Sequence, residues 1–143
     1  KIYKKLKKPR KNIKRKTLIK KLDSAFSQYI RWRDADADGL VKCITCDTKK
    51  DIKQMQCGHF MSRRHYATRW HEKNSAGQCY GCNIGSQGMQ YRMSKELDIK
   101  HGEGTAESMH QRSQDSRKYT NEELIQLIIY YKRLTDDMQN KHS

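Results

Sequence analysis

Two short segments, Cys43-Ile44-Thr45-Cys46 and Cys79-Tyr80-Gly81-Cys82, decide the fold of this chain. Each is a Cys-x-x-Cys turn that presents two sulfurs in one direction, and two such turns can enclose one tetrahedral zinc ion. Two disulfides in a secreted protein are the alternative, but four cysteines in this spacing favour metal ligands in a reducing cytoplasm. The sequence therefore predicts a structural zinc site that holds together the 32 residues between the pairs.

The composition indicates a small, basic domain. Of the 143 residues, 34% are hydrophobic and 33% are charged, and the net charge is +15. A core this small needs support, and zinc supplies roughly 10–16 kcal/mol of apparent binding free energy in small zinc peptides. No run of residues resembles a transmembrane segment or a secretory signal. We therefore expect a cytoplasmic protein without a membrane partner.

The positive charge is concentrated near the N-terminus, where residues 1–21 contain twelve Lys and Arg and no acidic residue. Such a block binds polyanions, and nucleic acid is the partner that it indicates. The other interpretation is a solubilising tail.

The chain divides into five expected parts. They are a flexible basic arm (1–16), a helix and turn (17–39), a zinc-stabilised core (40–100), a polar linker (101–118) and a C-terminal helix (119–139). The polar linker is expected to be a loop or a weak helix. The first helix has an apolar stripe at helical spacing, formed by Leu18, Leu22, Ala25, Phe26, Tyr29 and Ile30. The last helix begins with a capping box at Thr120 and Glu123, and its apolar face consists of Leu124, Leu127, Ile128, Tyr131, Leu134 and Met138.

Within the core we expect a hairpin from Leu40 to His59, a basic loop over 60–75, a return strand into Cys79, and a helix from about Asn83. The segment from Asp34 to Gly39 imitates the start of a calcium-binding loop. Such a loop needs an acid at its twelfth position, which is Thr45 here, so we do not expect calcium.

His59 and Asn83 are the residues that could catalyse phosphodiester hydrolysis. An imidazole that titrates near neutrality can activate water, and a side-chain carbonyl at a helix start can hold a hard divalent ion. A zinc with four sulfur ligands is coordinatively full and cannot be the catalytic metal. The alternatives are a packed histidine for His59 and a helix cap for Asn83.

At this point the sequence resembles the phage lambda NinG (Rap) family of recombination endonucleases. The matching segments extend over about residues 24–138 in unchanged order. They include the helix from Ala25 to Ala35, both cysteine pairs, Gly58-His59-Phe60, the segment from His65 to Asn74, Gln78 to Asn83, Tyr91-Arg92, and the segment from Tyr119 to Tyr131. The Cys82-Asn83 ending is also similar to that of phage endonuclease VII.

The resemblance implies a small α+β fold, with a ββα-metal (HNH) core and a four-cysteine zinc site flanked by N- and C-terminal helices. It implies His59 as the general base, Asn74 as the residue that orders the loop, and Asn83 as a ligand of the catalytic Mg²⁺ or Mn²⁺. His59 would also lie beside that ion. One departure is Gly58, because many HNH enzymes have an acid or a histidine ligand there. The second ligand is unassigned, with Glu72 and His65 as candidates.

The other candidates have competing roles. Glu72 could instead pair with Arg69 or Arg63, and His65 and His71 could contact phosphate. Cys57 is expected to be a buried thiol. Trp32 and Trp70 are expected to anchor the core or the loop. The predicted DNA contacts are Arg63, Arg64 and Arg69, with Lys4, Lys5, Lys7, Lys8, Arg10, Lys11, Lys14, Arg15 and Lys16 from the arm.

The function implied by the resemblance is cleavage of branched recombination intermediates, such as Holliday junctions and D-loops, in the cytoplasm of a bacterial host. A homodimer is expected from that task, formed through the apolar faces of the terminal helices, and recombination proteins are possible partners. Two alternatives stay open: a non-catalytic zinc module that binds nucleic acid, and a nuclease specific for one linear duplex sequence.

Overall fold

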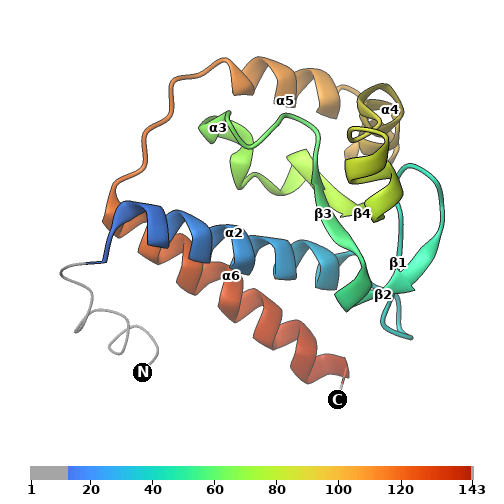
Figure 1. Ribbon diagram of the computed structural model, residues 1–143, viewed down its shortest axis with the longest axis horizontal. Coiled ribbons are helices and arrows are strands. Elements are labelled where there is room, and N and C mark those ends of the chain that lie inside the picture. The colour runs from blue at the N-terminus through green and yellow to red at the C-terminus, as the bar shows by residue number, and fades with distance from the viewer. Residues whose placement is uncertain (1–12, 143) are drawn as a thin grey trace. The chain divides into compact units, whose positions relative to one another are not determined.

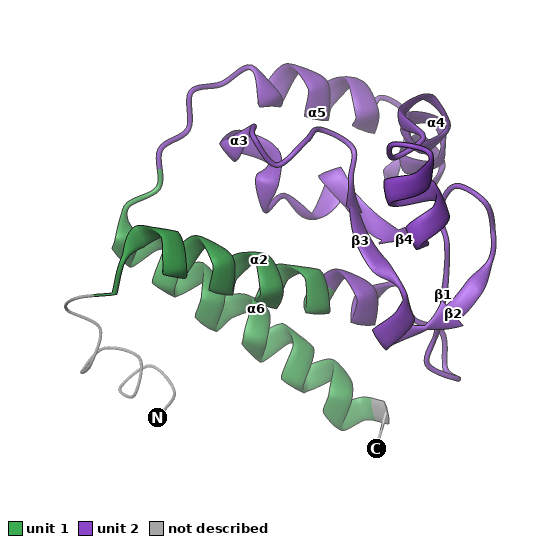
Figure 2. Ribbon diagram, in the orientation of Figure 1, with its two compact units in different colours: residues 1–29, 119–143 green, residues 30–118 purple. Residues whose placement is uncertain are grey.

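The computed structural model describes residues 13–142 and divides the chain into two compact units (Figures 1 and 2). The first comprises residues 1–29 and 119–143, and the second residues 30–118. The predicted arm contacts Lys4, Lys5, Lys7, Lys8, Arg10 and Lys11 lie outside the described residues. No helix in the described range is long and apolar enough to cross a membrane.

The first unit consists of two helices that bury their apolar faces within the chain. Helix α2 (Arg15–Arg33) crosses into the second unit after Tyr29, and helix α6 (Asn121–His142) closes the first unit. All six residues of the predicted α2 stripe are buried. The rings of Phe26 and Tyr131 meet edge to face, with 5.0 Å between centroids. Of the predicted α6 face, Leu124, Ile128 and Tyr131 are buried, whereas Leu127, Leu134 and Met138 are half-buried. A dimer through these faces stays a prediction.

The start of α6 has the predicted capping box. The backbone N–H of Glu123 donates to the Thr120 hydroxyl over 3.1 Å, and the N–H of Thr120 donates to the Glu123 carboxylate over 2.9 Å. Two main-chain donors that the helix cannot satisfy are thereby paired.

The second unit contains two separate antiparallel hairpins. Strand β1 (Leu40–Lys42) pairs with β2 (Lys49–Asp51) around the first cysteine pair. Strand β3 (Gln56–His59) pairs with β4 (Ser75–Gln78). The prediction of one hairpin from Leu40 to His59 is therefore wrong, because the strand that ends in His59 pairs with the return strand instead.

Helical segments connect and follow these strands. A 3-10 turn η1 (Ile52–Gln54) precedes β3, and helix α3 (Tyr66–Arg69) and the 3-10 turn η2 (Glu72–Asn74) lie between β3 and β4. A π-helical turn η3 (Gly81–Gly85) follows the second cysteine pair, and α4 (Gln90–His101) and α5 (Thr105–Ser113) come next.

One prediction for this part needs correction. The long helix expected from Asn83 is a π turn followed by a separate helix, because Met89 takes a left-handed conformation between them (φ 49°). For the polar linker over 101–118, the structure has the helical alternative, since it contains α5, which buries Ala106 and Met109.

Two small apolar clusters are found among the buried residues of the second unit. One comprises Val41, Met55 and the buried cysteines Cys43, Cys79 and Cys82, and the other comprises Ala76, Met93 and Leu97. The first cluster surrounds the cysteines, so metal binding and packing stabilise the same part of the fold. The result is a small α+β protein with two two-stranded sheets.

Candidate functional site

The four paired cysteines meet in space. The Sγ atoms of Cys43, Cys46, Cys79 and Cys82 all lie within 4.8 Å of one another, and those of Cys46 and Cys79 are 3.6 Å apart. Sulfurs bound to one tetrahedral zinc at about 2.3 Å are separated by roughly 3.8 Å, whereas a disulfide needs about 2.05 Å. All four are free thiols. The set fits a metal ion such as zinc and excludes the alternative of two disulfides.

Polar groups around the sulfurs complete this centre. The N–H of Cys79 donates to Cys43 Sγ over 3.3 Å, and the hydroxyl of Thr48 lies 3.2 Å from Cys46 Sγ. Hydrogen bonding to Thr48 lowers the pKa of Cys46 to about 6, whereas burial raises the pKa of Cys79. Four crowded sulfurs resist simultaneous ionisation, so a bound cation is what would hold all of them as thiolates.

His59 is the last residue of β3 and is half-buried. Its Nε2 lies 3.0 Å from the main-chain carbonyl of Arg69. A carbonyl oxygen only accepts, so the neutral ring carries its proton on Nε2 and keeps the basic lone pair on Nδ1. The loop therefore fixes both the orientation and the tautomer of the imidazole, as a general base requires.

Asn74 holds together the two ends of the loop that follows His59. It is fully buried, and its Nδ2 donates to the Met61 carbonyl over 3.0 Å while its Oδ1 accepts from the Met61 N–H over 2.9 Å. Its own carbonyl accepts from the N–H of Phe60 over 2.8 Å. These contacts are those of a residue that orders the loop, and the part of Asn74 in catalysis stays a prediction.

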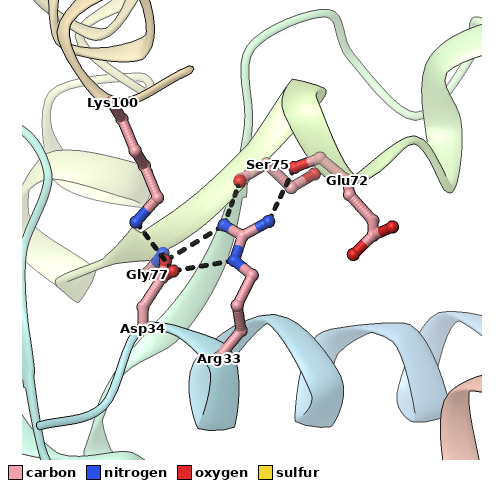
Figure 3. Close-up of polar contacts among 6 residues, drawn as sticks. All are labelled: Arg33, Asp34, Glu72, Ser75, Gly77 and Lys100. Atoms are coloured by element: carbon pink, nitrogen blue, oxygen red, sulfur yellow. Dashed lines mark hydrogen bonds and ion pairs between the residues drawn. The ribbon is translucent and has the colours of Figure 1, made fainter. Parts of the chain in front are cut away.

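Arg33, at the end of α2, holds the strand that lies opposite His59 (Figure 3). Its Nη1 donates to the carbonyl of Glu72 and its Nη2 to the carbonyl of Ser75, both over 2.8 Å. Ser75 is the register partner of His59. One guanidinium thus fixes both ends of the η2 turn that carries Asn74.

Asp34 completes this network and is 5% exposed. Its carboxylate accepts from Arg33 Nε, Lys100 Nζ and the N–H of Gly77, each over 2.8 Å (Figure 3). Burial by itself would raise the pKa of Asp34, but its hydrogen bond with Arg33 and the charges of Arg33 and Lys100 lower it below the ordinary value. Sequence reasoning interpreted these two residues only as the end of a helix and the start of a calcium-loop-like turn, because their partners other than each other lie more than 38 positions away.

Gly58, directly before His59, has no room for a side chain. A Cβ there would lie 2.2 Å from Oε1 and 2.9 Å from Cβ of Gln78. The fully buried Gln78 amide is fixed because its Nε2 donates to the Thr45 hydroxyl over 3.0 Å and to the Gly88 carbonyl over 2.9 Å. This packing gives a physical reason for the absence of an acid or histidine before His59, so a second metal ligand must come from another position.

The substitution Gly58→Ala is therefore expected to destabilise the fold by about 1–3 kcal/mol, the usual cost of overpacking a core. The matched control is Gly85→Ala, where nothing lies within 4 Å of the new Cβ and the φ angle is not positive. Urea denaturation of both variants measures the difference. Equal midpoints for the two variants would show that Gln78 moves aside at no cost.

Asn83 lies in the π turn η3, and its Nδ2 donates to Gln56 Oε1 over 2.8 Å. Because the amide nitrogen is the donor, the carbonyl Oδ1 is the atom that a cation could use. Gln56 begins β3, however, three residues or roughly 10 Å of strand before His59, and residues an odd number apart face opposite sides of a strand. These contacts do not bring Asn83 and His59 together, so their convergence on one cation stays a prediction.

The two further metal-ligand candidates lie on either side of α3. Glu72 joins the Arg33 network through its main-chain carbonyl. His65 is the N-cap of α3, and its Nε2 accepts from Arg64 Nε over 3.3 Å. A cation on that nitrogen would have to displace Arg64, so ligation by His65 or Glu72 stays a prediction.

The three arginines of the loop differ in what they contact. Arg69 donates from Nη1 to the Arg63 carbonyl over 2.7 Å, and its guanidinium carbon lies 5.2 Å and 5.4 Å from the ring centroids of Tyr66 and Trp70. These contacts make Arg69 an anchor of the loop. Arg63 and Arg64 are exposed, and DNA contact by all three remains a prediction.

Comparison with known proteins gives one match. The sequence matches the family described as Bacteriophage Lambda NinG protein over residues 1–141. No curated protein and no solved structure is significantly similar to it. The match extends over nearly the whole chain, well beyond the two cysteine pairs.

Proposed function

Because the chain belongs to the bacteriophage lambda NinG family, we propose that it is a metal-dependent endonuclease that cleaves branched DNA during phage-type recombination. Its substrates would be Holliday junctions and D-loops. Its cofactors would be one structural Zn²⁺ on the four cysteines and a catalytic Mg²⁺ or Mn²⁺. The active centre would be of the HNH type, with its base at the end of β3.

The observation that carries this proposal is the hydrogen bond between His59 Nε2 and the Arg69 carbonyl, 3.0 Å long. With the proton on Nε2, Nδ1 can take a proton from a water molecule as its oxygen forms the new bond to phosphorus. The bond from phosphorus to the 3′ oxygen then breaks, which gives a 5′ phosphate and, after protonation, a 3′ hydroxyl. A divalent ion, when bound, supplies stabilisation of the charge on the phosphate and the leaving oxygen.

Asn74 and Arg33 support this chemistry by positioning. Asn74 closes the loop whose Arg69 carbonyl orients His59, and Arg33 holds Ser75, the strand partner of His59. Catalytic groups need to be held within about 0.5 Å of their working positions. The hydrogen bonds of Asn74 and Arg33, which meet at η2, support such precise positioning of His59.

The proposal of branched DNA as the substrate is supported by the net charge of the protein, and the symmetry of a four-way junction bears on its oligomeric state. The net charge of +15 favours contacts with phosphates from several strands. A four-way junction has two equivalent strands to cut, so a homodimer with two active sites is proposed. Three residues of the predicted α6 face, Leu127, Leu134 and Met138, are only half-buried, so this face remains a candidate for the dimer contact.

A panel of linear, forked, D-loop and four-way DNA, each with Mg²⁺, Mn²⁺ or a chelator, tests the proposal. We expect cleavage of the branched substrates with either ion and none of the linear duplex. Activity lost in the chelator should return with added Mg²⁺ if only the catalytic ion was removed. Preference for one linear sequence would instead indicate a sequence-specific nuclease.

One observation favours a second candidate, a zinc-stabilised module that binds nucleic acid without cleaving it. Asn83 donates to Gln56, at the opposite end of β3 from His59. If the two side chains cannot serve one phosphate, the basic zinc-binding scaffold remains. Binding of branched DNA without cleavage under every metal condition of the panel would support this candidate.

A further inference from the structure

Helix α5 packs against α3 and η2 within the second unit. A basic pocket of about 420 Å³ lies between α5 and the residues at η2. Its polar lining consists of His71, Lys73, Ser108, Gln111, Arg112 and Asp115. The pocket is open to solvent and contains two cationic side chains, one carboxylate and three neutral polar groups. Among these residues, the sequence indicated a possible phosphate contact for His71 alone, and it did not single out the others.

Arg112 enters this pocket in a fixed orientation. Its Nε donates to the carbonyl of Ala67, a buried residue of α3, over 3.1 Å. Through this bond, α3 fixes the orientation of the planar guanidinium. A guanidinium that is already oriented loses little entropy when its terminal nitrogens bind a phosphate.

His71 enters the pocket as a hydrogen-bond donor. The backbone N–H of Lys73 donates to His71 Nδ1 over 3.2 Å, so the proton of the neutral ring is on Nε2. Burial, and then the charges of Arg112 and Lys73, lower the pKa of His71, which keeps the ring neutral near pH 7. A neutral Nε2–H still donates to a phosphate oxygen.

We propose that this pocket binds one phosphodiester of the DNA strand that passes His59, through Arg112, Lys73 and His71. The location supports this assignment because Ala67, which orients Arg112, and Arg69, whose carbonyl orients His59, are two residues apart in one short helix. The Asp115 carboxylate also lines the pocket and repels any anion there, so Arg112 and Lys73 have to outweigh it. The inference rests on the proposed function for its ligand, but it concerns binding and not cleavage.

The test measures affinity for a four-way junction without added divalent ions, while single linkages are replaced by neutral methylphosphonates. For the wild-type protein, one position should weaken binding several-fold. The double variant Lys73→Ala/Arg112→Ala should bind more weakly and lose sensitivity at that position. The slope of log affinity against log salt should become shallower by about 0.9, the value for one phosphate contact.

The matched control is Lys49→Ala/Lys53→Ala, which removes the same charge from exposed positions on and beside β2. It should retain the wild-type sensitivity at that linkage. Retained sensitivity in the pocket variant overturns the proposal, as does a scan in which no position matters. If the double variant unfolds early in a thermal scan, Lys73→Ala alone serves, because its side chain is exposed.

This result is independent of the nuclease proposal. A protein that binds junctions without cutting them would still show the position-specific loss. Conversely, an active nuclease whose methylphosphonate profile is unchanged by Lys73→Ala/Arg112→Ala would disprove the pocket and leave the proposed cleavage intact.

Discussion

Substituting His59 by alanine is expected to reduce the cleavage rate of a four-way junction by about 10²–10⁴-fold, the usual contribution of a general base. Affinity for the junction should stay close to that of the wild type, because the basic residues proposed to contact phosphate are unchanged and His59 lies at a strand end paired with β4. Single-turnover cleavage and a binding assay, made on the same preparation, measure the two quantities separately.

A matched control for this variant is His110→Ala. His110 is an exposed histidine of α5, and its main-chain carbonyl, which the substitution keeps, accepts from the Ser113 hydroxyl. Cleavage by His110→Ala should equal that of the wild type. Imidazole added to His59→Ala should restore part of the lost rate, since a small base can occupy the space of the ring. Unchanged cleavage by His59→Ala would assign the base to another residue.

The features that the sequence predicted well are those that depend on neighbours along the chain. The spacing of Leu18, Leu22, Phe26 and Ile30 places them on one helical face, and all four are buried in the structure. The capping box at Thr120 needs only a hydroxyl and a carboxylate three residues apart. A Cys-x-x-Cys turn likewise has its geometry in four residues, so the metal site could be predicted before the fold was known.

Strand pairing was not predictable in the same way. The strand that ends in His59 could pair with the preceding strand or with the one that follows the loop, and the polar, short sequences of both gave no preference. The structure pairs it with β4, and long-range bonds support that choice, since Arg33 and Asp34 hold β4 at Ser75 and Gly77. Such bonds have no signature in a local pattern.

Helix α5 was predicted only as one of two alternatives, a loop or a weak helix, for a different reason. Its buried face includes Thr105 and Ser113, residues that a hydrophobic pattern counts as polar. Each hydroxyl donates to a main-chain carbonyl within its own turn, Thr105 to Gly102 over 2.7 Å and Ser113 to His110 over 2.6 Å. A hydroxyl that is satisfied locally can be buried at little cost. Hydrophobic periodicity therefore underestimates helices of this kind.

The same distinction between local patterns and long-range contacts applies to the candidate site. The residue types around His59 came from the sequence and its resemblance, whereas the bonds that orient them came from the fold. Gly58 shows the difference most clearly, because its lack of a side chain is explained only by the position of Gln78. The contact of Asn83 with Gln56, the first residue of β3, could not be anticipated either, because the two residues lie 27 positions apart in the sequence.

Removal of one zinc ligand by Cys82→Ala is expected to unfold the second unit. A structural zinc contributes roughly 10–16 kcal/mol of apparent binding free energy, and a domain of this size has a net stability of only about 5–15 kcal/mol. Cys82 also belongs to the apolar cluster with Val41 and Met55, so loss of the metal and loss of packing coincide. The variant should contain less than one zinc per chain by elemental analysis.

Tryptophan fluorescence reports this unfolding selectively, because the chain's two tryptophans, Trp32 and Trp70, both belong to the second unit. Cys82→Ala should show the red-shifted emission of exposed indoles, and a strong chelator should produce the same change slowly in the wild type. The control is Cys57→Ala, a cysteine outside the metal cluster whose pKa is raised by burial to about 12. That variant should keep one zinc per chain and the emission of the folded protein. If Cys82→Ala also keeps its zinc and its emission, then three sulfurs are enough to hold the ion, and the fold depends on its apolar clusters rather than on the fourth ligand.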